Sequence, residues 1–318
     1  MASSNRLNRN LTDLVCLEVI RGATGSWEQH LRTASSLVPQ ILKDCMPPSQ
    51  KASARSKAQY ELESMEIITP EDYTASTVLI GSFMWFDILA GASTGSKHFL
   101  GIDYPLLLEG NSVCLGELVG CENWVLALIF RISELRNWKK ESASNNILSI
   151  TDLAKRSAEI EGCLQEKLTN ISVDYTAQEG SFPRTTPPFM TSGRITITRI
   201  FALSALTYLN VIVSGPIPEL PEITESVTKT VAEFAGLGDA RLLRSLIWPF
   251  CVTGCLASEE QRSVFRTLIL APDVDTITKG RCMGVFKLME ECWKRKARSI
   301  NSDWVSVMDS LGYSVLFS

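Results

Sequence analysis

The stretch that decides the fold is Ile200–Pro218, "IFALSALTYLNVIVSGPIP", which carries no charged residue. A transmembrane helix needs about 20 consecutive, mostly apolar residues. Here polar side chains interrupt the run at Ser204, Thr207 and Asn210, and a Gly-Pro pair ends it. The helical part is therefore too short to span a bilayer. We predict instead a helix buried at the centre of a helical protein, with no membrane association.

The segments around this central helix have the apolar periodicity of amphipathic helices. Apolar residues recur at three- and four-residue steps through residues 123–140, 149–168 and 223–234. Ser149 stands three residues before Asp152, which is a helix-start signal. Strand-like alternation is clear only in "RITIT", residues 194–198, and it merges into the central helix. We therefore predict an all-α fold, a single array of packed antiparallel helices with a central buried helix.

The breaks between these helices do not divide the chain into separate domains. Two of them are long, near residues 46–58 and 176–193, and the second is rich in proline, as a loop or lid would be. Apolar helices flank every break, so we predict one helical domain over residues 1–318. We expect roughly the first 12 residues to be disordered.

Charge and cysteine content exclude several kinds of site. The net charge is −4, so no basic field favours direct nucleic-acid binding. The nine cysteines include no C-x-x-C pair, and His30 and His98 are the only histidines. We therefore predict buried or free thiols in a reducing compartment, and neither a metal site nor a cofactor.

Catalytic motifs are equally scarce. "GASTG", residues 91–95, lacks the lysine and spacing of a phosphate-binding loop, and no G-x-S-x-G nucleophile elbow occurs. His98, near Asp103 and Tyr104, could act as a general base, as could His30. Histidines in such positions are more often structural, so the sequence favours a protein without enzymatic activity but leaves the question open.

One candidate ligand pocket follows from unusual residues in apolar helices. Asp87 lies in the aromatic stretch "FMWFD", and Trp248 precedes Pro249, which we expect to kink its helix. One interpretation is structural, with Asp87 pairing inside the core and Trp248 packing. The other is a pocket for a small apolar ligand. Its expected lining is Trp85, Asp87, Arg199, Tyr208 and Trp248.

Six short motifs in a fixed order point to a family. They are W-x-x-H-L, W-F-D, G-C, W-P followed by G-C, a late tryptophan and a final D-W. The residues that carry them are Trp27, His30 and Leu31; Trp85, Phe86 and Asp87; Gly120 and Cys121; Trp248, Pro249, Gly254 and Cys255; Trp293; and Asp303 with Trp304. In this order, from about Leu14 to Ser318, the chain resembles the fungal-specific regulatory domain of zinc-cluster transcription factors. The motifs are packing residues, so the resemblance implies a fold more strongly than an activity.

The resemblance also implies what the chain lacks. Members of the family carry a six-cysteine zinc head that binds DNA, and further helices before the W-x-x-H-L motif. This sequence resembles neither, so it reads as a regulatory domain that begins partway through. We expect no direct DNA binding. A protein partner or a second copy of the chain would cover the apolar face left by the missing helices, and the expected location is the nucleus.

Three functions remain open at this point. The first is a fungal transcription regulator, tied to a secondary-metabolite pathway and acting through partners or dimerisation. The second is a repurposed biosynthetic enzyme, cyclase- or isomerase-like, that positions a small apolar substrate in the helical cavity, in the cytoplasm. The third is a ligand-binding scaffold that pairs with a full-length relative.

Overall fold

The computed structural model describes residues 27–33, 35–36, 70–109, 113–178, 188–298 and 303–312. Within these ranges the chain forms helices and no strand, which confirms the all-α prediction. Residues 27–33 and 35–36 are helical, and the longer elements follow from α4. They are α4 (Pro70–Thr94), α5 (Tyr104–Glu109), α6 (Leu115–Val119), α7 (Asn123–Ser144), α8 (Ile150–Gln178), α9 (Pro188–Ser214), α10 (Pro221–Ala235), the 3₁₀ helix η2 (Ala240–Ser245), α11 (Ile247–Cys255), α12 (Arg262–Leu270), α13 (Thr276–Ala297) and α14 (Trp304–Leu311).

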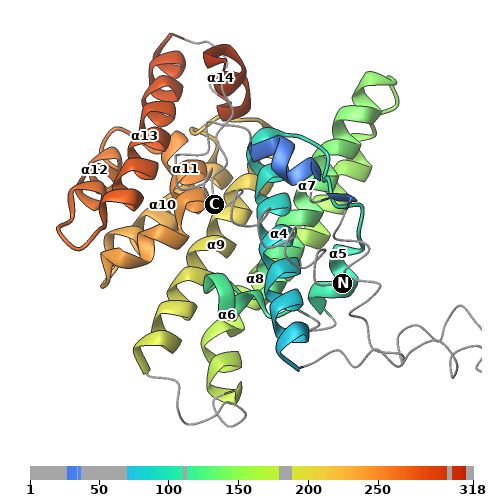
Figure 1. Ribbon diagram of the computed structural model, residues 1–318. Coiled ribbons are helices and arrows are strands. Elements are labelled where there is room, and N and C mark those ends of the chain that lie inside the picture. The colour runs from blue at the N-terminus through green and yellow to red at the C-terminus, as the bar shows by residue number, and fades with distance from the viewer. Residues whose placement is uncertain are drawn as a thin grey trace, which may run out of the picture.

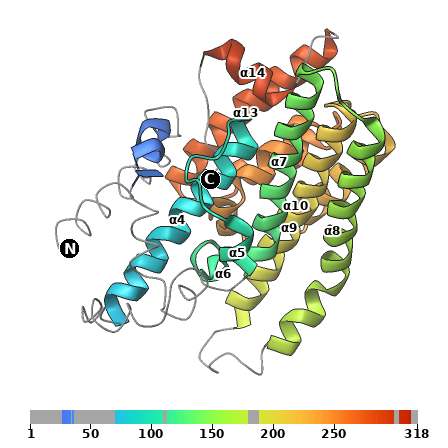
Figure 2. The same ribbon diagram turned by 90° about the vertical axis from the view of Figure 1, so that its right-hand side faces the viewer.

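Helix α9 is the centre of the array. It packs against α7, α8, α10 and α11, and α7 to α10 stand side by side (Figures 1 and 2). Among the described residues it is the one helix long and apolar enough to cross a membrane, over 192–214. However, 78% of its most apolar window is buried inside the protein. The predicted central buried helix is therefore confirmed.

The amphipathic stripes face this core as expected. The apolar residues of α7 and α10 at helical spacing are buried, and on α8 only the last member of the stripe, Leu168, is half-buried. Ser149 Oγ accepts a hydrogen bond from the Asp152 amide at 3.1 Å, so the predicted helix start is confirmed. The buried stripe residues are Val125, Leu128, Ile132, Leu135, Leu153, Ile160, Leu164, Ile223, Val227, Val231 and Phe234.

Two local predictions need correction. The expected kink at Pro249 is wrong, because α11 begins at Ile247 and the proline is its third residue. In the first turn of a helix an amide has no intrahelical partner, so a proline costs nothing there. The long loop near 176–193 is shorter than expected, since α8 runs to Gln178 and α9 begins at Pro188. The loop near 46–58 and the first 12 residues lie outside the described residues.

Motif residues join helices that are far apart in the sequence. The Trp293 Nε1 donates a hydrogen bond to the Gly254 carbonyl at 2.9 Å, which joins α13 to α11. Gly254 lets the two helices approach closely, because a Cβ there would lie 2.0 Å from Met289 Cε. The Trp304 Nε1 donates to the Ser93 carbonyl at 3.2 Å and ties α14 to α4. The motifs therefore act as packing residues, as the sequence indicated.

Candidate functional site

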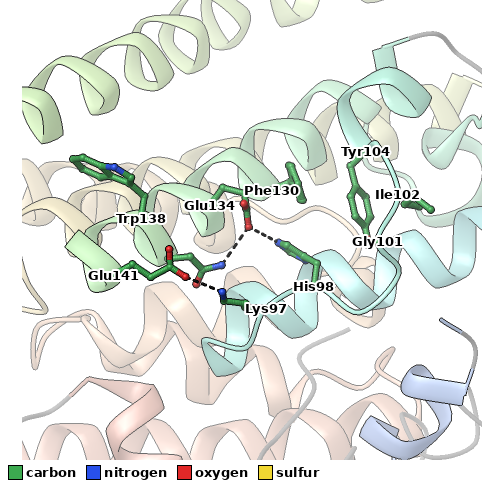
Figure 3. Close-up of a pocket in the computed structure, with 10 residues that line it drawn as sticks. Lys97, His98, Gly101, Ile102, Tyr104, Phe130, Glu134, Trp138 and Glu141 are labelled. Carbon is green, nitrogen blue, oxygen red and sulfur yellow. Dashed lines mark hydrogen bonds and ion pairs between the residues drawn. The ribbon is translucent and has the colours of Figure 1, made fainter. Parts of the chain in front are cut away.

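A cavity of about 380 Å³ opens between α7 and the loop that joins α4 to α5 (Figure 3). The loop and the first residue of α5 form one wall, and one face of α7 forms the other. The lining residues are Lys97, His98, Gly101, Ile102 and Tyr104 on the first wall, and Phe130, Glu134, Asn137, Trp138 and Glu141 on the second. This volume is within the range of small-molecule sites, about 300–1,000 Å³.

Helix α7 can line the cavity because it has two faces. Phe130, Glu134, Trp138 and Glu141 recur at three- and four-residue steps and so share one side of the helix. The apolar stripe of α7 lies on another side and is buried in the core. The same periodicity thus supplies both a packing surface and a mixed aromatic and acidic wall.

His98 is the central side chain of the cavity. Its side chain is only 7% exposed. The imidazole packs against both Tyr104 and Phe130, with ring centroids 5.5 Å and 4.7 Å away, and these two rings also stack on each other at 4.7 Å. Gly91 on α4 makes room for it, because a Cβ at that position would lie 2.6 Å from His98 Cε1. The ring is therefore held in one place by packing from three sides.

The two nitrogens of this ring have different neighbours. The Nδ1 atom lies 3.3 Å from the Asp87 main-chain carbonyl oxygen. The Nε2 atom lies 4.0 Å from Glu134 Oε1 and has no hydrogen-bond partner in the described part of the chain. Burial lowers the pKa of His98 below its usual value, against the opposing effect of the Asp87 and Glu134 carboxylates. The geometry therefore favours a neutral imidazole.

Asp87 holds the loop that carries His98. Its buried carboxylate accepts hydrogen bonds from the Phe99 amide at 2.9 Å, the Leu100 amide at 3.1 Å and the Tyr104 hydroxyl. Burial first, and then the Asp87 charge, raise the pKa of Tyr104, so this hydroxyl remains a donor. This arrangement corresponds to the structural interpretation of Asp87, in which the acid is paired inside the core.

Asp103, which is close to His98 in the sequence, has a different role. It directly precedes α5, and its Oδ1 accepts a hydrogen bond from the Leu106 amide at 3.0 Å. The acid that positions His98 is instead Asp87, eleven residues earlier on α4. The "KHFLGIDY" segment therefore supplies the histidine of the site, and the acidic residue that positions this histidine comes from α4.

The rim of the cavity carries paired charges. Lys97 Nζ lies 2.7 Å from Glu141 Oε1, and this pair raises the pKa of Lys97 and lowers the pKa of Glu141. The Arg156 guanidinium, from α8, lies 4.5 Å from the centre of the Trp138 ring. Glu134 is half-exposed and is the acid closest to His98 Nε2. The cavity thus presents hydrogen-bond acceptors beside an aromatic wall, which is the composition of a binding site.

Three of the five residues predicted to line a pocket meet in a buried aromatic cluster. Trp85 and Trp248 both pack against Phe201, with ring centroids 5.3 Å and 5.8 Å from it. Tyr208 meets Trp248 edge-on, with centroids 5.9 Å apart. All four rings are buried in the core.

The other two predicted residues lie elsewhere. Asp87 faces the 97–104 segment, and the half-buried Arg199 lies 3.9 Å from Glu233 on α10. None of the five lines the cavity beside His98. A ligand pocket formed by Trp85, Asp87, Arg199, Tyr208 and Trp248 stays a prediction.

Sequence reasoning missed the α7 wall. Glu134 and Trp138 belong to the polar side of a segment noted only for its apolar stripe. The sequence did contain a signal for this wall. Phe130, Glu134 and Trp138 follow one another at four-residue steps, so they share one side of the helix. This signal could not show that this side faces the His98 loop, since the loop is brought there by α4.

The cysteines and acids of the described residues do not form a metal site. No group of three or more potential ligands is placed to hold a metal ion in that part of the chain. Seven described cysteines are free thiols, and Cys251 and Cys255 lie one helical turn apart with sulfurs at 3.9 Å. Burial raises the pKa of Cys282 to about 12, so it is a thiol at neutral pH. Cys16 and Cys45 lie outside the described residues.

Comparison with known proteins defines the family. The model of the fungal specific transcription factor domain matches residues 11–318. The trichothecene biosynthesis transcription regulator TRI10 of Trichoderma arundinaceum is 30% identical over 95% of this chain and 71% of that protein. TRI10 of Fusarium sporotrichioides is 28% identical, covering 98% and 74%. The ustiloxin B cluster transcription factor ustR of Aspergillus flavus is 27% identical over 96% of this chain and 53% of its own length.

No solved structure matches this chain. The family match covers nearly the whole sequence, and it includes the motif residues that join α4, α11, α13 and α14 in the core. On both grounds the chain belongs to the family of the fungal-specific transcription factor domain.

Proposed function

We propose that this chain is the regulatory domain of a transcription regulator that controls the genes of a secondary-metabolite pathway. The observation that carries the proposal is the extent of the match to named regulators. Two relatives, both named as trichothecene biosynthesis transcription regulators, align with 95% and 98% of the chain. A third, named for the ustiloxin B cluster, aligns with 96%. These names favour a regulator over a biosynthetic enzyme.

We further propose that these 318 residues act through a protein partner or a homodimer, in the nucleus. Their nine cysteines include no C-x-x-C pair of the kind a zinc-cluster head uses. The net charge of −4 gives no general attraction to DNA. A partner that reads DNA would supply the specificity that this segment does not encode.

Deleting the gene and measuring transcripts tests the regulatory role. We expect the transcripts of a set of co-regulated biosynthetic genes to change together, and their pathway product with them. A stalled intermediate with normal transcripts would instead indicate a missing enzyme and contradict the proposal. Re-expressing the parent chain should restore the transcripts, which controls for effects of the deleted DNA itself, and re-expressing the destabilised Trp304→Ala chain should restore them less.

The partner and the location have separate tests. Light scattering on the purified chain reports whether it is a dimer, and affinity purification from nuclear extract reports whether a DNA-binding protein accompanies it. A fluorescent fusion reports its location. A monomer recovered alone, or a fusion excluded from nuclei, would overturn this part of the proposal.

A further inference from the structure

The hydrogen-bond chemistry of His98 defines what the cavity can accept. The Asp87 carbonyl oxygen can only accept a hydrogen bond, so its contact with Nδ1 requires the proton on Nδ1. In the neutral ring, Nε2 then carries a lone pair and is an acceptor. This atom is buried in the cavity wall beside Glu134 and has no donor among the described residues.

A second acceptor lies beside the first. Glu134 Oε1 is 4.0 Å from His98 Nε2, too far for a direct hydrogen bond. One atom lies within hydrogen-bond distance of both once the half-exposed Glu134 side chain turns aside to admit it, provided that this atom carries at least two hydrogens to donate. A hydroxyl group donates one, whereas an amino group donates two or three. The pair therefore selects an amino group over an alcohol.

The charges around the cavity favour a cation. Glu134 and Glu141 line it against one cation, Lys97, whose ammonium group is engaged by Glu141. The Arg136 guanidinium, on the same helix, is directed away to the Gly91 carbonyl at 2.8 Å. The Tyr104 hydroxyl donates a hydrogen bond to the Asp87 carboxylate, so neither group competes with Glu134 for a ligand. Glu134 Oε1 accepts one hydrogen bond, from Asn137 Nδ2 at 3.2 Å, and a carboxylate has further lone pairs to offer a ligand.

We propose that the cavity binds a small molecule with a protonated primary amine, whose ammonium group donates to His98 Nε2 and to the Glu134 carboxylate. The apolar part of the ligand lies against the aromatic wall of Phe130 and Trp138. This site is independent of the proposed regulatory role, because binding is measured on the purified chain without reference to any gene.

The experiment uses the two histidines of the chain as reporters. The protein is labelled with ¹⁵N on the imidazole rings, so that NMR shows the tautomer of each ring. His30 is the internal control, because it is the only other histidine and does not line the cavity. In the free protein we expect His98 to be neutral with its proton on Nδ1.

Three probes of matched shape separate the contributions. Phenethylamine carries the charge and the hydrogens, 2-phenylethanol carries one donor and no charge, and phenethyltrimethylammonium carries the charge without N–H groups. We expect a saturable shift of the His98 Nε2 signal with phenethylamine and none at His30. The two other probes should bind about tenfold or more weakly, the loss expected for a charge-assisted hydrogen bond.

Matched variants locate the site. Glu134→Gln should weaken phenethylamine binding by about tenfold or more, since it removes the carboxylate charge. Glu159→Gln on the exposed side of α8 makes the same charge change away from the cavity and should leave binding unchanged. His98→Phe keeps an aromatic ring against Tyr104 and Phe130 and should also lose phenethylamine binding, which is followed in this variant through the backbone amide signals of the cavity residues. Backbone amide spectra report whether each variant is folded.

The pH dependence gives an independent check. The groups that face His98 are Asp87 on α4, Glu134 and Arg136 on α7, and Tyr104 on α5. A protonated His98 would donate to Glu134 and close the acceptor pair, so binding should weaken as the pH falls through the pKa of His98. The amine stays charged throughout. No saturable shift at His98, or equal affinity for the alcohol, would overturn the proposal.

Discussion

At the scale of single residues, one buried acid organises the site. Asp87 is fully buried, and its carboxylate replaces water for two loop amides and one hydroxyl. A buried carboxylate is tolerated only when its oxygens are bonded in this way. The same residue offers its main-chain carbonyl to His98. Asp87 of the W-F-D motif thus has two roles. Its carboxylate holds the loop that carries His98, and its main-chain carbonyl positions the His98 ring.

Removing the Asp87 carboxylate should destabilise the protein and displace His98. In Asp87→Ala the amides of Phe99 and Leu100 and the Tyr104 hydroxyl lose their acceptor, at a cost of about 3 kcal/mol or more in the free energy of unfolding. Asp87→Asn retains one oxygen acceptor and should lose less. Urea unfolding followed by tryptophan fluorescence measures both. An Asp87→Ala variant within about 1 kcal/mol of the parent would refute this role.

At the scale of elements, helix α13 shows how charge and capping define both ends. At its start, Asp275 accepts hydrogen bonds from the Thr278 amide at 2.9 Å and the Thr278 hydroxyl at 2.6 Å. Its last turn carries Lys294, Arg295 and Lys296, which suits the negative end of the helix dipole. Lys296 also lies 2.7 Å from Glu219. The basic cluster thus has a structural place at a helix end.

The cap of α13 should make stability depend on pH. Hydrogen bonds from Thr278 lower the pKa of Asp275 below its usual 3.8. The charged cap therefore stabilises the fold fully above the unfolded-state pKa, and this contribution is lost as the pH falls through the lower folded-state pKa. Asp275→Ala should cost about 1 kcal/mol at pH 7. Below pH 3.8 the difference in the free energy of unfolding between the parent and Asp275→Ala should become smaller.

Asp275→Asn is the control, because it keeps an oxygen acceptor but cannot titrate. Its stability relative to Asp275→Ala should not change with pH. Urea midpoints of the three proteins, measured from neutral pH to about pH 3, test this linkage. If the difference in urea midpoint between the parent and Asp275→Ala is constant over the whole pH range, the cap does not make stability depend on pH.

At the scale of the whole molecule, the final D-W motif closes the array. Trp304 is 1% exposed, its indole nitrogen bonds the Ser93 carbonyl on α4, and its ring packs 6.0 Å from Tyr208 on the central helix. The last described helix therefore contacts elements from the beginning and the middle of the chain. Such contacts between distant segments make a domain unfold as one unit.

Trp304→Ala should destabilise the whole domain. The buried indole is replaced by a cavity, with an expected loss of about 3–5 kcal/mol. Trp304→Phe keeps most of the apolar volume and loses the hydrogen bond to Ser93, so its loss should be smaller. Trp124→Ala, at a half-buried tryptophan of α7, serves as the matched control. Thermal unfolding followed by circular dichroism should show a single transition at lower temperature for Trp304→Ala, whereas a local loss confined to α14 would contradict this view.

The sequence by itself determined the helical class, the central buried helix and the amphipathic stripes of α7, α8 and α10. These are local properties, because a period of 3.6 residues is visible within one segment and needs no knowledge of the neighbours. The order of the packing motifs likewise identified the family. The position of Pro249 was misjudged, since the helix start at Ile247 depends on the 3₁₀ turn before it.

Only the tertiary structure decided the site. His98, Asp87 and Glu134 belong to a loop and two different helices, and their meeting depends on how α4 packs against α7. No pattern along the chain encodes which face of α7 meets the loop, because side-chain neighbours between elements follow from packing of the entire core. The unpaired His98 Nε2 arises for the same reason: its environment is made by residues that the sequence keeps apart.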